Sequence, residues 1–140
     1  MEYNKIISIS GQSGLFELKA SKADGAIVRS LADGTTKFIS SRLAQFSHLE
    51  SIEVYTTGEN VNLVDVFTAM AHSEVPKPDV KDLKAVKQYF EQVYPSMDFE
   101  RVYNSDMKKM VKWFDLLQAA GVEIKLSQPA EEEEEQGDMA

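Results

Sequence analysis

The sequence predicts an α+β protein with two folded parts and a tail. The spacing of the apolar residues changes near residue 57 from a period of two, typical of strands, to a helical period. Glycine-containing turns punctuate the first part, and a run of acids lies near the end of the chain. We therefore expect a small antiparallel SH3-like β-barrel of about five strands over residues 1–57. A three-helix unit over residues 58–126 and a disordered acidic tail over residues 127–140 would follow it.

The first part consists of short alternating segments rich in β-branched and aromatic residues. The connections GQSG, SKADG and ADGT each supply a glycine where a tight turn can require a positive φ. Together these features predict five strands, at residues 5–10, 14–20, 26–31, 36–40 and 51–56.

The predicted fourth and fifth strands are joined by SRLAQFSHLE, in which Leu43, Phe46 and Leu49 recur every third residue. This spacing predicts a helical turn that plugs one end of the barrel. Side chains alternate along a strand, so one of two sets would line the interior. These sets are Ile7 with Ile9, or Leu15 with Ile27 and Phe38. A chain of about fifty-five residues is only marginally stable alone, so packing against the second part would stabilise it.

The second part begins with two predicted helices. Asn62 is a suitable N-cap for a helix that ends near His72, and the prolines of SEVPKP interrupt the pattern. Asp79 is then predicted to cap a second helix that runs to Tyr94, where Pro95 ends it.

The third helix has the strongest pattern in the chain. It is predicted over residues 106–120, with Asn104 or Ser105 as its cap and Gly121 in the left-handed conformation after its end. Its apolar stripe comprises Met107, Met110, Val111, Phe114 and Leu117.

Three segments resemble signature segments of an uncharacterised domain-of-unknown-function family of small proteins from Bacteroidetes-type bacteria. They are ISISGQSGLFELKA, LESIEVYT and RVYNSDMKKMVKWFDLLQAAG. The resemblance covers most of the chain apart from the HSEVPKP linker and the acidic tail. It implies a bacterial, cytoplasmic protein in two parts, and it implies no catalytic or binding residue.

The formal net charge of −8 is concentrated in the tail, where six of the 23 acids lie and no base does. The rest of the chain has 17 acids against 15 bases, so the body is close to neutral. A run of like charges repels itself and is usually solvated, although the tail could also fold back onto lysines of the body. A near-neutral body argues against strong non-specific binding of nucleic acid.

Composition narrows the class of protein further. The chain has no cysteine, no apolar run long enough for a membrane span and no secretory-signal pattern at Met1. We therefore expect a cytoplasmic protein that does not associate with membranes.

Catalysis is not expected either. Histidine is the usual general base near neutral pH, but His48 and His72 have no partner at metal-ligand spacing. The common nucleophile, phosphate-loop and zinc motifs do not occur, and the acids Asp98 and Glu100 suit a helix start. We expect no metal and no cofactor; an enzyme whose residues carry no familiar motif is a third alternative.

The paired glycines Gly11 and Gly14 raise the question of a phosphate-binding loop. Such a loop needs a following helix whose N-terminus directs amides at the anion. The segment after Gly14, LFELKA, alternates like a strand. A tight turn between two strands is the better interpretation.

The main hypothesis for function is a non-catalytic interaction module or adaptor that binds a protein partner, with a homodimer left open. SH3-like barrels bind peptides on aromatic surfaces, and Tyr3, Phe16 and Tyr55 are the candidate rings. Burial of these rings would remove the main support for a peptide groove.

The alternative is an RNA- or other nucleic-acid-binding protein that uses the barrel face and two lysine-bearing helices. It requires both lysine sets to face one side; otherwise each set is simply the solvated face of an amphipathic helix. The candidate residues are Lys81, Lys84 and Lys87 on the second helix, and Arg101, Tyr103, Lys108, Lys109, Lys112 and Trp113 at the third.

Overall fold

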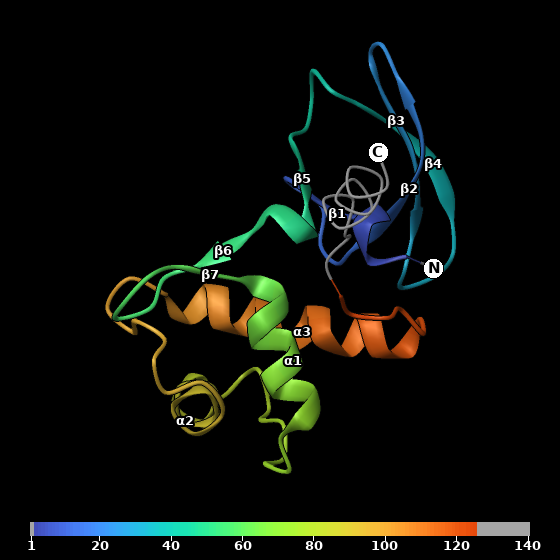
Figure 1. The fold of residues 1–140 in the computed structure, drawn as a ribbon. Helices are drawn as coiled ribbons and strands as arrows, with labels where there is room; N and C mark the ends of the chain where they lie inside the picture. Colours follow the sequence, from blue (N-terminus) through green and yellow to red (C-terminus); the bar gives the residue numbers. More distant parts are fainter. Residues whose placement is uncertain (1, 126–140) are drawn as a thin grey trace, which may run out of the picture.

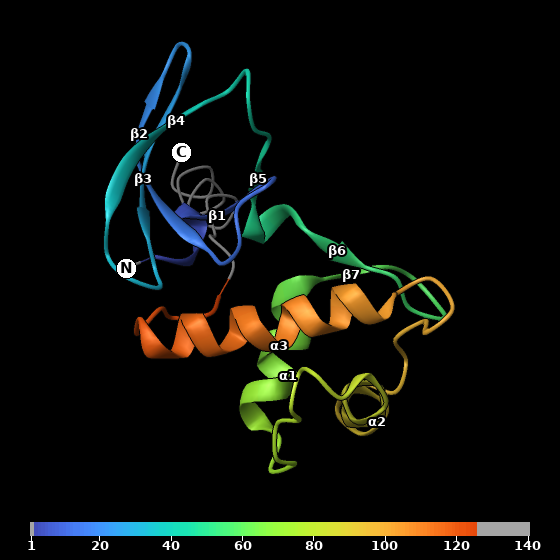
Figure 2. The same ribbon diagram turned by 180° about the vertical axis from the view of Figure 1, so that it is seen from behind.

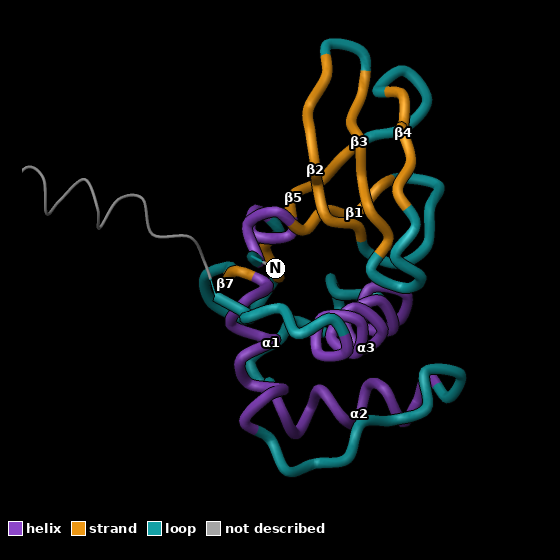
Figure 3. Tube along the Cα trace, turned by 90° about the vertical axis from the view of Figure 1, so that its right-hand side faces the viewer, coloured by secondary structure: helices purple, strands orange, loops and turns teal. Residues whose placement is uncertain are grey.

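The computed structural model describes residues 2–125 as an antiparallel sheet placed over three helices (Figure 1). The predicted acidic tail lies outside the described residues. Helix α3 runs directly beneath the sheet, and α2 lies on the far side of α3 from the sheet (Figures 1 and 3). The mixed α+β class is therefore confirmed.

The sheet has five strands in the order β4-β3-β2-β1-β5, and every neighbouring pair is antiparallel. A β-bulge between Leu18 and Ala20 interrupts the β2–β3 pairing. The strand bounds are β1 Ile6–Ile9, β2 Phe16–Lys22, β3 Gly25–Ser30, β4 Thr36–Ser40 and β5 Phe46–His48.

The predicted SH3-like barrel is not confirmed, because the sheet is open: β4 and β5 are its two edges. The fifth strand was also predicted at the wrong place. It lies at β5, inside the segment predicted to be a helical plug, and only Leu49–Ser51 forms a 3-10 turn there. Residues 51–56 instead contain β6 (Glu53–Val54), which pairs with β7 (Val61–Asn62) in a separate two-stranded sheet (Figure 2). A spacing of three over so few residues fits a strand followed by a turn as well as it fits a helix.

Two glycines are required by the backbone conformation of a turn, and a third by close packing between strands. Gly11 and Gly14 have φ values of +80° and +84°, so the GQSG segment is a turn between β1 and β2, as predicted. At Gly25 a Cβ atom would lie 2.2 Å from the carbonyl oxygen of Ile39, so only glycine fits beside β4.

Helix α1 (Leu63–His72) begins as predicted, since the Asn62 side chain accepts a hydrogen bond from the Val64 amide at 2.9 Å. Helix α2 (Leu83–Val93) starts later than predicted because Asp82, rather than Asp79, is its cap. The Asp79 carboxylate accepts from the amide of Lys81 in the preceding turn.

Helix α3 (Asn104–Ala119) starts two residues before the predicted position. The Asp106 carboxylate accepts from the Tyr103 amide at 3.1 Å, so it satisfies one backbone donor at this end. At the other end Gly121, with φ +72°, reverses the chain, and the Val122 amide donates to the Leu117 carbonyl. The predicted C-terminal glycine of the helix is confirmed.

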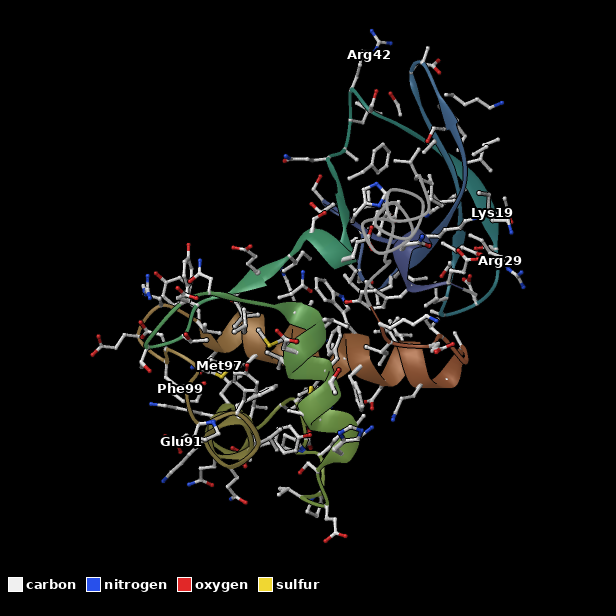
Figure 4. The ribbon with its side chains drawn as sticks, viewed as in Figure 1. Lys19, Arg29, Arg42, Glu91, Met97 and Phe99 are labelled. Atoms are coloured by element: carbon white, nitrogen blue, oxygen red, sulfur yellow. The ribbon has the colours of Figure 1, made fainter. Side chains whose placement is uncertain are left out.

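Two apolar clusters hold the fold together. The larger one joins the three helices to the underside of the sheet through Tyr3, Ile6, Leu15 and Leu49. It also includes Met97 in the loop between α2 and α3 (Figure 4). The two predicted parts therefore share one continuous core.

The smaller cluster lies on the opposite face of the sheet and comprises Ile7, Ile9, Phe16, Ala26 and Val28. Of the two predicted interior sets, Ile7 with Ile9 is the correct one for this cluster. Leu15 instead enters the larger core, and the paired Ile27 and Phe38 belong to neither cluster, Ile27 being half-buried and Phe38 49% exposed.

Candidate functional site

The predicted aromatic groove is absent from the described surface. Tyr3 is 2% exposed because its 3-10 turn packs it into the larger core, and Phe16 is 3% exposed within the smaller one. Tyr55 alone of the three is open to solvent, at 45% exposure. The prediction that these rings form one binding surface was wrong, because the 3-10 turn packs Tyr3 into the larger core and strand alternation directs Phe16 into the smaller one.

Tyr3 also has an unusual hydroxyl group. Within residues 2–125 this hydroxyl has no hydrogen-bond partner. Burial, reinforced by the nearby Glu50 carboxylate, raises the pKa of Tyr3 above its ordinary value. The phenol therefore stays neutral at physiological pH, and its role is that of a core side chain.

The two lysine sets do not face the same side. Lys81, Lys84 and Lys87 are exposed on or just before α2, which packs against the side of α3 that is turned away from the sheet (Figures 1 and 3). Lys108, Lys109 and Lys112 lie on α3 and face the sheet across a cleft. The single basic stripe considered for nucleic acid is therefore divided between two sides of the molecule.

The cleft has a volume of about 970 Å³. One wall is α3, which contributes Ser105, the three lysines and Trp113. The other wall is formed by the end of β1 and the turn that follows it, residues 8–14, with Gln45 and Ser47 at β5. Apart from Ile9, the described residues of this second wall are serine, glutamine and glycine, and none of them is charged.

Charge in the cleft is predominantly positive. Among the described residues, Lys108, Lys109 and Lys112 make no ion pair or side-chain hydrogen bond. The one carboxylate in the lining, Asp115, forms an ion pair with Lys77. A cleft whose three ammonium groups have no partner within residues 2–125 is therefore set into a protein whose formal net charge is −8.

Backbone contacts hold the sheet-side wall in place. Ser10 and Gln45 exchange two hydrogen bonds: the Ser10 amide donates to the Gln45 carbonyl, and the Gln45 amide donates to the Ser10 hydroxyl at 2.7 Å. A Cβ atom on Gly14 would lie 3.6 Å from Leu116 Cδ1, so this turn reaches the side chains of α3. The GQSG turn was predicted to be purely architectural, yet it also forms one wall of the cleft.

A smaller cavity of about 280 Å³ lies on the other side of Lys109 and Trp113, which line both spaces. Its floor is apolar and comprises Ile52, Val54, Leu63, Val102 and Met110. The sequence contains no signal for this cavity, because its walls come from β6, the start of α1 and α3.

Arg101 lies at the rim of this cavity and is engaged by its neighbours. Its guanidinium donates to the Asp98 carboxylate at 2.8 Å and to the Thr56 carbonyl at 3.1 Å, and it lies 4.5 Å from the centre of the Tyr55 ring. Hydrogen bonding from Arg101 lowers the pKa of Asp98. Arg101 thus holds the Tyr55 and Asp98 loops together. Tyr103, which was also selected from the sequence, is 66% exposed and lines neither the cleft nor the smaller cavity.

Within residues 2–125 no group of three or more histidine, aspartate or glutamate side chains is placed to hold a metal ion. His48 and His72 are both exposed. Nor does the described part of the chain contain a helix with the length and apolar character required to cross a bilayer.

The basic side chains of the sheet itself lie elsewhere. Lys19, Arg29 and Arg42 project from the outer side and far end of the sheet, away from the helices (Figure 4). They do not line the cleft.

Comparison with known proteins relates both parts of the chain to families. Residues 4–49 match a family model described as a domain of unknown function (DUF5606), and residues 52–117 match a second one, also a domain of unknown function (DUF6852). No curated protein matches the chain. A solution NMR structure of a structural-genomics target from Bacteroides vulgatus is similar, with a TM-score of 0.67 and 28% identity over 89% of this chain and 96% of that one. The resemblance was predicted to a single domain-of-unknown-function family over most of the chain; both parts do match domains of unknown function, but two different ones.

Proposed function

We propose that this protein is a non-catalytic interaction module that binds an acidic segment of a partner protein in the cleft between the GQSG turn and α3. The observation that carries the proposal is the position of Lys108, Lys109 and Lys112, which face an uncharged polar wall without a partner among the described residues. Carboxylates entering the cleft would gain attraction from one wall and meet no repulsion from the other.

The dimensions of the cleft suit an extended peptide. Its α3 wall runs from Ser105 to Ala119, which corresponds to about 21 Å at 1.5 Å per residue. An extended strand covers that length with about six residues. The serine, glutamine and backbone groups of residues 8–14 can exchange hydrogen bonds with the peptide main chain.

Exposed ion pairs contribute only about 0.2–1 kcal/mol each. Three lysines therefore support modest, salt-sensitive binding rather than tight binding. An affinity of this size is typical of a transient protein–protein complex.

A nucleic-acid ligand has less support. Single-stranded RNA is usually bound by lysines together with several exposed rings. Trp113 is the one aromatic residue that lines the cleft, and the α2 lysines lie on another side. The experiment therefore includes RNA as a competing ligand.

The test uses the fluorescence of Trp113, the one tryptophan of the chain and part of the cleft wall. A peptide with six consecutive glutamates is titrated against the full-length protein, and the same peptide with glutamines serves as the reference. We expect the glutamate peptide alone to bind. K108Q/K112Q should weaken its binding about tenfold.

The matched control is K84Q/K87Q, which removes the same charge from α2 and should change the affinity less than about twofold. Equal effects of the two double variants would contradict the cleft as the binding site. Stronger binding of a single-stranded RNA pool than of the glutamate peptide would favour the nucleic-acid alternative instead.

A further inference from the structure

We infer that the cleft and the smaller cavity form one two-part site, whose ligand is a partner segment with an apolar side chain next to its acidic run. The inference rests on the proposed function, because it identifies a second requirement of the same ligand. The acidic run would occupy the cleft, and the apolar side chain would enter the cavity.

The two spaces share a wall. Lys109 and Trp113 line both the cleft and the cavity, and they lie one helical turn apart on α3. A ligand that contacts Lys109 from the cleft is therefore already at the entrance of the cavity. Trp113 is half-buried, so its ring is available on both sides.

The chemistry of the cavity differs from that of the cleft. Val54, Leu63 and Met110 form part of an apolar floor that is almost fully buried. Its volume of about 280 Å³ is slightly below the range of about 300–1,000 Å³ usual for small-molecule sites. Its lining suits an apolar side chain such as leucine or methionine, which the volume can accommodate.

The charged groups that line the cavity balance one another, so they do not favour an acidic occupant. Arg101 is engaged by Asp98, Thr56 and the Tyr55 ring. Two carboxylates, Glu53 and Asp106, line the cavity beside Lys109, so they offset the attraction that this lysine would exert on a glutamate inside the cavity. A neutral apolar residue does not depend on this balance.

The geometry of α3 sets the spacing of the ligand. Lys109 and Trp113 are separated by a rise of about 6 Å, which an extended peptide covers with about two residues. We therefore expect the apolar residue two to four positions from the nearest glutamate.

The experiment compares three peptides against the full-length protein: six glutamates followed by Gly-Ser-Leu, the same peptide with serine in place of leucine, and the leucine peptide with glutamines in place of glutamates. Trp113 fluorescence gives the affinities, and the methyl resonance of Met110 reports on the cavity. The leucine–glutamate peptide should bind about tenfold tighter than the serine peptide, because the leucine leaves water. It alone should shift the Met110 methyl signal.

A pair of tyrosine variants locates the effect. Tyr55→Ser removes an exposed ring from the cavity rim and should reduce the advantage of leucine to less than about threefold. Tyr103→Ser removes a more exposed ring that lines neither space, and it should leave that advantage unchanged.

The outcomes separate the two proposals. If the leucine and serine peptides bind equally and the glutamine peptide does not bind, the two-part site is overturned and the acidic cleft stands. If the tenfold advantage appears without a Met110 shift, the leucine lies elsewhere and the two-part site is again overturned. If the glutamine peptide binds as well as the glutamate peptide, the acidic cleft itself is wrong.

Discussion

Helices α2 and α3 look alike in the sequence, but they occupy very different surroundings. Each is amphipathic, and each is associated with three lysines. Helix α2 packs on one side and leaves its lysines in open solvent, whereas α3 lies between α2 and the sheet (Figure 3). The polar side of α3 therefore faces the end of β1 and the GQSG turn. Its three lysines line a cleft between the helix and these segments instead of lying in open solvent.

This difference shows what an amphipathic pattern specifies. It identifies the side of a helix that is buried and the side that remains polar. It does not identify what the polar side faces, because that depends on segments far away in the chain. For α3 the facing segment is the GQSG turn, about a hundred residues earlier by sequence number.

The largest effect is expected in the core beneath α3. Phe114 is 2% exposed and its ring centre lies 5.9 Å from that of Phe67. Phe114→Ala should lower the free energy of unfolding by about 3–5 kcal/mol, measured by urea denaturation. The control Leu83→Ala, on the exposed start of α2, should cost less than about 1 kcal/mol. A similar cost for both variants would contradict the central position of α3.

The wall opposite α3 can be perturbed next. Gly14→Ala places a side chain at φ +84°, which should cost about 1–2 kcal/mol in unfolding free energy. A Cβ atom there makes only an ordinary contact with Leu116, so the expected loss of stability comes from backbone strain and not from a steric clash. Gly58→Ala, at a glycine with neither a positive φ nor a close neighbour, is the control. Equal stability of the two variants would show that the turn tolerates another conformation.

The tail offers a smaller test of the charge of the cleft. Residues 127–140 carry six acids and no base, and tethering gives such a segment an effective concentration of about a millimolar. Deleting these residues should therefore tighten binding of the glutamate peptide about threefold at low salt, as measured by Trp113 fluorescence. At about 1 M salt, where the screening length is about 3 Å, the difference should disappear. An unchanged affinity at low salt would mean that the acids do not compete for the lysines.

The smallest expected effect concerns pH. Hydrogen bonds from Arg101 lower the pKa of Asp98 in the folded protein below its ordinary value of 3.8. A lowered carboxylate pKa stabilises the fold above the unfolded pKa, and this contribution is lost as the pH falls below about 4. Melting temperatures between pH 3 and pH 7 should therefore decline less steeply for Asp98→Asn than for the wild type. Parallel curves would contradict a role for this pair.

Much of the local structure follows from local signals. The Asn62 cap of α1, the end of α3 at Gly121 and the turn between β1 and β2 were all predicted correctly. Each depends on the chemistry of a few adjacent residues. The start of α2 was misplaced because Asp79 and Asp82 are both suitable caps, and only packing chooses between them.

The candidate site was less predictable. The three α3 lysines and Trp113 were selected from the sequence, and the structure places them together on the cleft wall. Tyr3 and Phe16 were selected as well, but both are buried. Phe16 follows another apolar residue, Leu15, so nothing local identifies which of the two faces solvent, and the burial of Tyr3 depends on how its 3-10 turn packs against the rest of the chain.

The sequence by itself determined the α+β class, the change from strands to helices, the position of most turns and the apolar stripe of α3. These depend on residue spacing and on backbone preferences, which act over a few residues. Only the tertiary structure decided that the sheet stays open, that both parts share one core, and that the GQSG turn faces the α3 lysines. These depend on contacts between distant segments, whose free energy appears only when the whole chain packs together.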